Sequence, residues 1–566
     1  MSGNFLTPTA LWKNFKTDGE VKAEIIAKTV DRDLSVIHLR ISGKKTADGE
    51  VGIYATLTHK AQVTLAPAIV LVQDFNTNEA NALSDELAEK GYVVLAVDIA
   101  GATDFNIGKT IEGVEKPYTL YPESLSYANY DKTAEDKSEI AGDASATCWY
   151  EWARVVRYAV EYLKTQSLVE KIGIIGIGGG ATPVWQVVSD SCGISCAVIV
   201  ANAGWKGYRG IDKFGDTPEP QFSDDALKYI AGIEPQAYAA HVKCPLMFLA
   251  PTNSPDYDID RSYDTVSRIS AKIYAAADYS VGERRTVGVD CFNEALVFLD
   301  AMLIKDAVLP KPLSVKSAVA GKPLQVEVSP DKTGLKDIAV YFAEGETLPA
   351  LRAWEKVSAF KESENGAYLF DYTPYAGSKT VYFFARAEYD NGMRICSGVA
   401  CKKMDESKYE DVKQRVLYSS RFSVGANGFY TAGENVGGIV FKTDKNSAVT
   451  VKNGPMDITG LFCPTGIVTF KINAEKYKPL QGALLMCDVF VKGGGDFKVN
   501  AIADYFGERT VYTAVVKLFG GLWQNVKIEI NNFKTAQGLA LKTYDNIEAL
   551  EFSADSDFLI NNILWV

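Results

Sequence analysis

The chain has 566 residues, with 59 Lys and Arg against 71 Asp and Glu, so its formal net charge is −12. At about 100–200 residues per domain, this length predicts about three domains. The acidic balance argues against a nucleic-acid partner, because phosphate binding requires clustered Lys and Arg and no basic run is present. Hydrophobic residues at 47% and charged residues at 23% are ordinary for a globular protein, and the 46 Gly and 20 Pro are spread along the chain, which excludes a disordered or collagen-like chain.

The sequence contains no feature typical of a membrane or secreted protein. No stretch approaches 18 consecutive apolar residues, so no membrane span is predicted. The start, Met1 to Phe5, lacks a basic segment followed by an apolar one, so no secretory signal is expected. Nine Cys are dispersed along the chain, apart from the close pair Cys192 and Cys196. Such a set indicates reduced thiols and predicts a cytoplasmic location.

Residues 66 to about 303 alternate short apolar runs with helical patterns. The runs that read as strands are 67–72, 92–97, 172–176, 197–200 and 245–249, and a clear amphipathic helix covers 147–164. Near-continuous apolar strands are typical of a sheet that helices cover on both faces. The alternation predicts a mostly parallel, doubly wound sheet. Residues 21–60, which alternate apolar and polar side chains, predict antiparallel edge strands before it.

Beyond this part the helical pattern ends and strands recur. Residues 306–322, with Leu309 to Pro312, predict a linker that runs into the start of a β-sandwich. The run 381–389, the turn 390–392 and the run 393–396 predict a hairpin. The predicted division is therefore a first domain at 1–305, an Ig-like or fibronectin-III-like sandwich at 313–403, a connector at 404–415 and a jelly roll at 416–566.

The predicted strand–turn–helix at 171–181 carries the sequence Gly176-Ile-Gly178-Gly-Gly180. With the strand order, this segment makes residues 20–305 resemble the α/β-hydrolase family, in particular its dienelactone hydrolase and acetyl-xylan-esterase-like branch. The resemblance implies a nucleophile elbow, Gly-x-Ser-x-Gly, whose serine sits on a strained turn. Here the flanking glycines match, but the nucleophile position is Gly178, which has no side chain to attack a substrate.

The resemblance also implies an acid and a base on two later loops. The acid would follow the strand at 245–249, where the sequence places Ser254, with Asp256 or Asp258 as alternative acids. The base would be a His after the last strand, predicted at 271–275, but residues 278–285 contain none. The chain has three histidines, His38, His59 and His241, in the early strands or before a strand at the opposite edge. The family's catalytic triad is therefore predicted to be degenerate, with no catalytic residue in place.

Other nucleophiles and cofactor motifs are weaker. Thr182 is expected inside the helix after the turn, and Cys148, Cys192 and Cys196 have no evident base, so these cysteines are predicted to be core residues. The segment 176–181 fits the loose dinucleotide pattern Gly-x-Gly-x-x-Ala. That pattern requires the first strand of a βαβ unit and an acidic residue after the next strand, and both are missing. No cofactor and no metal are expected.

The last part resembles a galactose-binding-like or carbohydrate-binding jelly roll through residues 523–533 and the ending 559–566. Sugar recognition in such a module would require exposed aromatic side chains with polar neighbours. The candidates are Tyr505, Phe506, Arg509 and Trp523.

The leading hypothesis is a catalytically inactive protein with an α/β-hydrolase fold and two β-sandwich domains. It would act as a structural, self-assembling or binding protein, with a homo-oligomer or filament as one form of self-association. Two alternatives stay open. One is an esterase or acyl hydrolase that acts on acylated carbohydrate with unconventional residues, and the other is a carbohydrate-binding protein that uses its C-terminal jelly roll.

Overall fold

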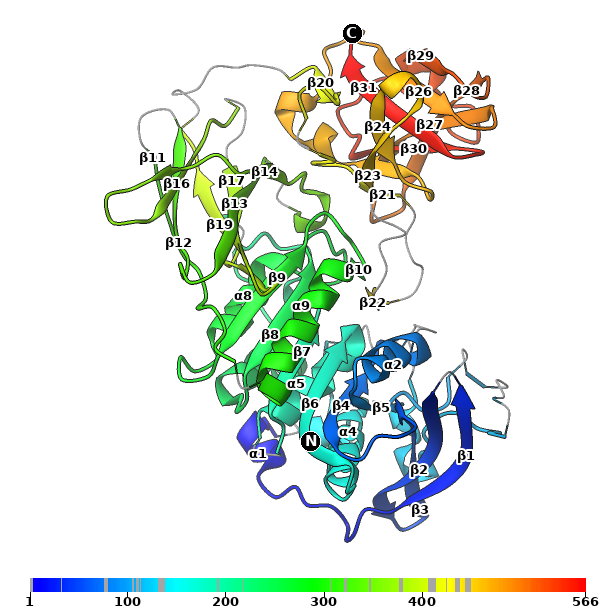
Figure 1. Ribbon diagram of the computed structural model, residues 1–566, viewed down its shortest axis with the longest axis vertical. Helices are drawn as coiled ribbons and strands as arrows, with labels where there is room; N and C mark the ends of the chain where they lie inside the picture. Colours follow the sequence, from blue (N-terminus) through cyan, green and yellow to red (C-terminus); the bar gives the residue numbers. More distant parts are fainter. Residues whose placement is uncertain are drawn as a thin grey trace.

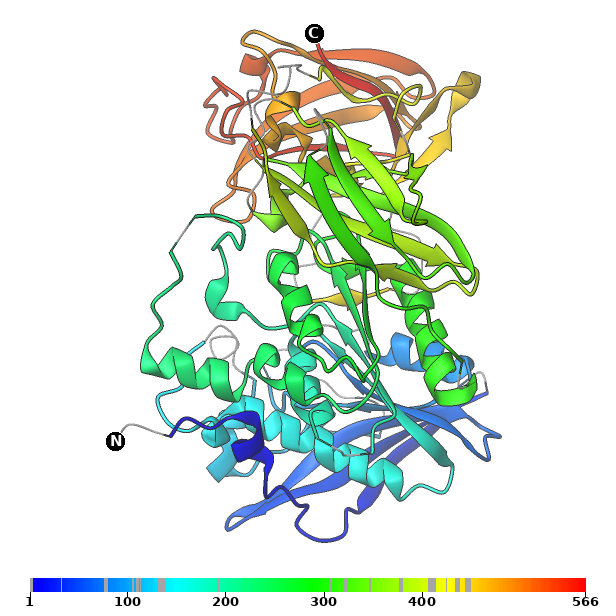
Figure 2. The same ribbon diagram turned by 90° about the vertical axis from the view of Figure 1, so that its left-hand side faces the viewer.

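The computed structural model describes the chain except for residues 1–3, 32, 76–79, 104–105, 108–110, 112, 131–137, 191–192, 217, 306, 320–322, 346–347, 376–379, 406–413, 424, 433–437 and 443–448. Three parts follow one another along the longest axis of the molecule (Figures 1 and 2). The first part is an α/β fold, and the second and third parts are built from β-strands.

The first part contains a mostly parallel sheet with the strand order β1-β2-β3-β5-β4-β6-β7-β8-β9. Its strands are β1 Ala23–Asp31, β2 Leu34–Thr46, β3 Gly49–Lys60, β4 Ala66–Val72, β5 Val93–Val97, β6 Val169–Ile177, β7 Cys196–Val200, β8 Leu246–Pro251 and β9 Ala275–Ser280. β1, β2 and β3 pair antiparallel at one edge, and β5, β4, β6, β7, β8 and β9 run parallel. The predicted α/β-hydrolase fold class is confirmed.

Helices cover both faces of this sheet, because its strands are apolar on both sides. Val70 of β4 packs in the same core cluster as Trp152 and Val184, whereas its neighbour Leu71 packs with Leu87 and Phe298 on the opposite face. The helices are α1 Pro8–Trp12, α2 Ala80–Glu89, α4 Cys148–Lys164, α5 Ala181–Val188, α6 Asp224–Gly232, α7 Pro235–Tyr238, α8 Ile259–Ser267 and α9 Val289–Asp300. The helix expected at 147–164 is thus present, with Thr147 as the N-cap that accepts a hydrogen bond from Tyr150 N.

The last strand of the first part lies further along the chain than the sequence indicates. The prediction placed it at 271–275, but β9 begins at Ala275 and ends at Ser280. Ile273 and Tyr274 gave the apolar signal, whereas the true strand, Ala-Ala-Ala-Asp-Tyr-Ser, is weakly apolar and contains the buried Asp278. The loop in which a catalytic base is expected therefore begins at Val281 and not at Asp278.

The second part continues the large sheet of the first. Cys396 of β18 pairs with Ala277 of β9, so the strand order runs on as β9-β18-β17-β13-β14, with β19 also paired to β17. A second sheet has the order β11-β12-β16-β15. The strands are β11 Ser314–Val319, β12 Leu324–Ser329, β13 Leu335–Glu344, β14 Glu355–Val357, β15 Lys361–Glu362, β16 Tyr368–Tyr372, β17 Thr380–Tyr389, β18 Arg394–Cys396 and β19 Ala400–Lys403. The expected hairpin is β17–β18.

The third part contains two antiparallel sheets, as a β-sandwich requires. One has the order β23-β24-β31-β26-β29 with β20 on β31, and the other has the order β21-β25-β30-β27-β28. The strands are β20 Val416–Tyr418, β21 Tyr430–Thr431, β23 Thr450–Asn453, β24 Thr459–Phe462, β25 Ile467–Thr469, β26 Leu485–Val491, β27 Gly495–Ala503, β28 Thr510–Leu518, β29 Trp523–Ile528, β30 Ala549–Ala554 and β31 Phe558–Trp565. The connector predicted at 404–415 lies mostly outside the described residues.

One strand of the third part belongs to neither of these sheets. β22, Val440–Phe441, lies beside the first part, where it pairs in parallel with β10, Thr286–Val287 (Figure 1). We call residues 438–442 the arm. The arm places a piece of the third part against the carboxyl end of the large sheet.

Two further expectations concern the cysteines, predicted to be reduced thiols, and membrane spans, of which none is predicted. Eight cysteines lie in the described part of the chain, and all eight are free thiols. Among the described residues, no helix is both long enough and apolar enough to cross a bilayer.

Candidate functional site

The turn between β6 and α5 has the geometry of a nucleophile elbow. Gly178, the residue after β6, has φ +53°, a left-handed conformation that glycine adopts without steric cost. Its two flanking glycines are tightly packed. A Cβ at Gly176 would lie 2.8 Å from Val184 Cγ2, and a Cβ at Gly180 would lie 2.5 Å from the carbonyl oxygen of Gln73. The chain thus keeps the small residues that such a turn requires but lacks a side chain at its apex.

The space for that missing side chain is taken by a carboxylate. A Cβ built on Gly178 would lie 1.7 Å from Asp74 Oδ2, so no larger residue fits while Asp74 keeps this position. Asp74 is only 5% exposed. It follows β4, the neighbour of β6 in the sheet, where Val72 pairs with Gly176. Adjacent parallel strands end at the same edge of a sheet, so Asp74 and Gly178 face each other there.

The carboxylate of Asp74 is held by two backbone amides. Oδ1 accepts a hydrogen bond from Phe75 N at 2.8 Å, and Oδ2 accepts one from Ile439 N in the arm at 2.9 Å. Gly438 has φ +62°, and a Cβ there would lie 2.8 Å from Asp74 Cγ. Hydrogen bonds to an ionised carboxylate are about twice as strong as those between neutral groups. Asp74 therefore fixes the start of the arm directly above the elbow.

Main-chain pairing and aromatic packing fix the rest of the arm. Val440 N donates to the carbonyl oxygen of Arg285 at 2.8 Å, and Lys442 N donates to that of Val287 at 2.9 Å. The ring of Phe441 packs edge-on against Phe292 of α9, with 5.4 Å between the ring centroids. Ile439, Val440 and Phe441 are all buried. The arm is thus part of the packed structure at this edge of the sheet.

The base loop, residues 281–285, is covered by the third part and contains no histidine. The guanidinium of Arg284 donates a hydrogen bond to the hydroxyl of Tyr505. Gly282 packs so closely on the ring of Tyr430 that a Cβ there would overlap it. Burial raises the pKa of Glu283 to about 7, while nearby cations oppose this shift. The loop therefore serves as a contact surface between two parts of the chain.

The three histidines lie on other elements. His38 is on β2, where its Nδ1 is 2.8 Å from the hydroxyl of Tyr54 and burial lowers its pKa. His59 is at the end of β3, with Nδ1 2.8 Å from the carbonyl oxygen of Lys60. His241 ends the short turn Ala239–His241 that precedes β8. No imidazole lies on the base loop, as the sequence indicates.

The acid position is Ser254, which is buried after β8. Its hydroxyl accepts hydrogen bonds from the amides of Asp256 and Tyr257, both at 3.2 Å. The Asp256 carboxylate pairs with Arg285, with 2.8 Å between Oδ2 and Nε. Asp258 caps α8 by accepting from Asp260 N at 2.9 Å. Burial and the negative charge of Asp260 raise the pKa of Asp258 to about 6.

The other nucleophiles considered from the sequence are buried groups. Thr182 Oγ1 accepts a hydrogen bond from Asn202 Nδ2 at 3.0 Å. Cys148 starts α4, and Cys196 starts β7, where burial raises the pKa of its thiol. A raised thiol pKa disfavours the nucleophilic thiolate. Cys192 lies outside the described residues.

The four candidate sugar-binding residues do not form one surface. Tyr505 is 2% exposed and contacts Arg284 of the first part, while Arg509 stacks on Tyr505 with 4.6 Å to the ring centroid. Phe506 lies beside them, 5.0 Å from Tyr505 between ring centroids. Trp523 is on β29 in the other sheet of the sandwich, where its Nε1 donates to the carbonyl oxygen of Pro455 at 3.1 Å. The first three residues are thus grouped, and Trp523 lies apart.

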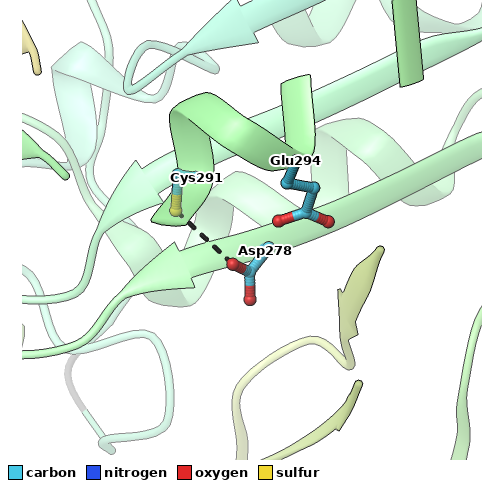
Figure 3. A group of neighbouring side chains, drawn as sticks. All are labelled: Asp278, Cys291 and Glu294. Atoms are coloured by element: carbon cyan, nitrogen blue, oxygen red, sulfur yellow. Dashed lines mark hydrogen bonds between the residues drawn. The ribbon is translucent and has the colours of Figure 1, made fainter. Parts of the chain in front are cut away.

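A second group of ionisable side chains joins the first and second parts. Asp278 of β9 lies next to Cys291 and Glu294 of α9, and the ligand atoms of these three residues are within 4.8 Å of one another (Figure 3). The second part adds two guanidiniums. Arg386 Nε donates to Asp278 Oδ1 at 2.9 Å, and Arg394 Nη2 donates to Asp278 Oδ2 at 2.7 Å.

Arg386 and Arg394 determine the ionisation of Asp278 and whether this group could bind a metal ion. Burial opposes ionisation of Asp278, but the charges of Arg386 and Arg394 overcome that effect and hold its pKa below the usual value. Burial and the charge of Asp278 raise the pKa of Glu294, which disfavours a second negative charge beside Asp278. A metal ion would stand beside two cations here. The cluster is therefore built as a buried ion-pair network that clamps β18 to β9, and the residues fit a metal site poorly.

Sequence reasoning missed two of these features. Asp74 could have been found from its position, because it comes two residues after the strand at 67–72, whose neighbour carries the elbow. The arm carried no comparable signal, since its pairing with β10 joins residues about 150 positions apart in the chain.

A family match supports the fold of the first part. Residues 53–263 match the dienelactone hydrolase family. No curated protein sequence matches the chain. Similar solved structures include an acetyl xylan esterase from Paenibacillus sp. R4, with 13% identity over 52% of this chain and 92% of that one and a TM-score of 0.37.

Two further structures are similar to about the same degree. Acetyl xylan esterase 1 from Thermoanaerobacterium sp. has 11% identity over 50% of this chain and 89% of that one, with a TM-score of 0.34. Est1E from Butyrivibrio proteoclasticus has 11% identity over 43% of this chain and 88% of that one, with a TM-score of 0.28. By its sequence match, the chain contains a dienelactone hydrolase family domain.

The elbow geometry predicts that Gly178→Ser destabilises the protein and restores no hydroxyl nucleophile. The new Cβ overlaps the Asp74 carboxylate, and φ +53° is strained for serine. The left-handed conformation costs about 1–2 kcal/mol and overpacking about 1–3 kcal/mol, so we expect a loss of about 2–5 kcal/mol in the free energy of unfolding. Calorimetric unfolding measures it.

Gly142→Ser is the matched control, because no heavy atom lies within 4 Å of a Cβ at Gly142 and its φ is not in the left-handed region. We expect this control to change stability by less than about 0.5 kcal/mol. Equal stability of the two serine variants would contradict the assigned position of Asp74.

The ion-pair network predicts that Asp278→Asn strongly lowers the free energy of unfolding. This change leaves Arg386 and Arg394 buried beside a neutral amide, and removing one partner of a buried ion pair costs about 3–5 kcal/mol. Denaturant unfolding followed by near-ultraviolet circular dichroism measures the loss. Glu362→Gln is the control, because the ion pair of Glu362 with Lys332 is exposed on both sides and exposed pairs contribute about 0–1 kcal/mol. A loss no larger than that of the control would refute the clamp.

Proposed function

We propose that the dienelactone hydrolase family domain of this protein does not hydrolyse esters and serves as the structural core of a binding protein. The observation that carries the proposal is the Asp74 carboxylate, which lies in the space of the nucleophile side chain and is bonded to the arm. A family member needs that space for its serine and the volume above it for the substrate carbonyl.

Three groups required for acyl transfer are replaced. The nucleophile position is glycine, the acid position is Ser254, and the base loop has Arg284 and Arg285 where a histidine is needed. An arginine stays protonated at physiological pH and cannot accept the proton of a nucleophile. The remaining polar groups at this edge bind the second and third parts, as Asn253 does when its Nδ2 donates to the carbonyl oxygens of Ala350 and Arg352.

The β-sandwich parts suit a role in binding. They pack on the carboxyl edge of the large sheet through Asp260–Arg352, Arg284–Tyr505 and the arm, and these contacts use the surface that surrounds a catalytic cleft in this fold. The binding role extends to self-association, because the second and third parts add surface beyond the hydrolase fold. The domain is thus proposed as a platform that positions two sandwiches.

The family match favours one alternative, an ester hydrolase with unconventional residues. In that case Asp74 is the group to consider, because its carboxylate lies against the apex of the elbow at Gly178. A carboxylate can act as a nucleophile or as a base. An esterase assay distinguishes the proposed binding protein from this hydrolase alternative.

We expect no turnover of p-nitrophenyl acetate above that of heat-unfolded protein, and no labelling by a fluorophosphonate probe, which reacts with activated serines. The matched variants are Asp74→Asn and Ser254→Ala, and neither should change the background rate. A rate that exceeds background by orders of magnitude and is lost in Asp74→Asn would establish the hydrolase alternative instead. Stoichiometric labelling that Ser254→Ala abolishes would also contradict the proposal.

The hydrogen bond between Asp74 and the arm can be tested by hydrogen–deuterium exchange. In Asp74→Ala, Ile439 N loses its acceptor, so we expect amides of residues 438–442 to exchange at least about tenfold faster, which corresponds to about 1.4 kcal/mol. Peptides that cover β23 and β24 of the same part are the internal control and should not change. An unchanged exchange rate in the arm would show that Asp74 does not hold it.

A further inference from the structure

A separate pocket of about 160 Å³ lies where all three parts of the chain meet. The first part contributes Trp205 and the acid loop with Asp256 and Asp258, the second contributes Leu348, and the third contributes Phe506. Gly178 and Asp74 do not line it, so this pocket is distinct from the blocked elbow. It brings together Asp256, Asp258 and Phe506, which the sequence marked for two different reasons.

The pocket cannot be a property of the hydrolase family alone. Leu348 and Phe506 lie outside the matched residues 53–263, and both belong to the β-sandwich parts. Packing of the second and third parts onto the first therefore creates its walls. A site that exists only in the assembled chain points to a function of this arrangement.

One wall is held in a strained conformation. Trp205 has φ +66°, the left-handed region that costs a non-glycine residue about 1–3 kcal/mol. Its indole Nε1 donates to Thr265 Oγ1 at 2.8 Å, and the guanidinium of Arg268 lies 4.9 Å from its ring centroid. These two contacts fix the indole in place before any ligand arrives.

The charged groups of the pocket are largely balanced. Asp256 pairs with Arg285 at 2.8 Å, and Asp260 pairs with the buried Arg352 at 2.5 Å. Asp258 lies 3.4 Å from Arg261, while Arg209 donates to the carbonyl oxygen of Asp256 at 2.8 Å. The cations that line the pocket itself are Arg209 and Lys206, and the lining carboxylates are those of Asp212, Asp256, Asp258 and Asp260. A cationic ligand would meet the two cations, and an anionic ligand would meet the carboxylates. A neutral ligand avoids both repulsions and can still bond to both kinds of group.

We propose that this pocket binds a neutral, hydroxyl-bearing ring of the size of one monosaccharide. Hydroxyls can donate to the carboxylates of Asp256 and Asp258 and accept from Arg209, while the C–H face of the ring packs on Trp205, Tyr257 and Phe506. Pockets for drug-sized ligands occupy about 300–1,000 Å³, so the volume here suits a single ring and not a chain of rings.

The test uses the full chain and saturation-transfer difference NMR with glucose, xylose and myo-inositol as probes. Glucosamine and glucuronate, which add one positive or one negative charge to nearly the same ring, are the matched ligand controls. We expect signals from at least one neutral ring and signals at least about fivefold weaker from both charged analogues.

Two variants locate the binding. Phe506→Ala removes an aromatic wall, and Asp258→Asn removes a carboxylate while keeping a residue that caps α8 well. We expect each variant to weaken the signals at least fivefold with its unfolding temperature maintained. Phe519→Ala is the control, since Phe519 is 76% exposed on the third part and does not line the pocket.

The proposal is overturned if no neutral ring binds, if a charged analogue binds as well as the neutral one, or if the Phe506 and Asp258 variants bind like the wild type. None of these readouts depends on ester hydrolysis, so the result stands apart from that of the esterase assay.

Discussion

Polar contacts at the carboxyl edge of the large sheet hold the three parts of the chain together. Asp278 forms ion pairs with Arg386 and Arg394 of the second part, and Asp260 forms one with Arg352. Asp74 accepts a hydrogen bond from the arm of the third part. Each of these carboxylates is buried, and a buried charge is tolerated only with its partners in place. The edge that admits substrate in an open α/β fold is therefore, in this chain, the edge on which the other parts are built.

This constraint explains why a hydroxyl at the elbow and the present assembly exclude each other. The Cβ of any residue at 178 would overlap Asp74, and moving Asp74 would leave Ile439 N without its acceptor. An unsatisfied buried donor costs about 1–3 kcal/mol. Glycine at this apex is thus required by the neighbouring carboxylate and also by the left-handed backbone. Glycine at position 178 and the packing of the arm on Asp74 form one structural unit.

Local patterns in the sequence predict much of the fold. The apolar runs that became β4, β6 and β8 identify the parallel sheet, and the amphipathic pattern at 147–164 identifies the helix α4. β9 was misplaced because a strand with Asp278 at its centre lacks the usual apolar signal. That carboxylate is buried only because two arginines more than 100 residues away neutralise it, and periodicity within a short window contains no information about them.

For the candidate site, the sequence predicts the local turn but not the residues that pack against it. The elbow and the missing histidine follow from spacing along the chain, because a turn is a local structure. Asp74 and the arm depend on which strand lies next to β6 and on what packs above it, and both are properties of the tertiary structure. The pocket with Phe506 depends on contacts among three parts, so the sequence could mark Asp258 and Phe506 but could not bring them together.

The carboxylates at this edge differ in what surrounds them, and this difference separates structural groups from groups that can bind a ligand. Asp278 is compensated by two guanidiniums and holds its charge, so it is committed to the junction of two sheets. Asp74 is committed to the amides of Phe75 and Ile439. Asp258 borders a cavity, and burial and the charge of Asp260 raise its pKa to about 6. A raised pKa indicates that the protein stabilises the ionised form less well than water does. A ligand that donates a hydrogen bond to Asp258 would supply part of that missing stabilisation, whereas Arg386 and Arg394 already supply it to Asp278.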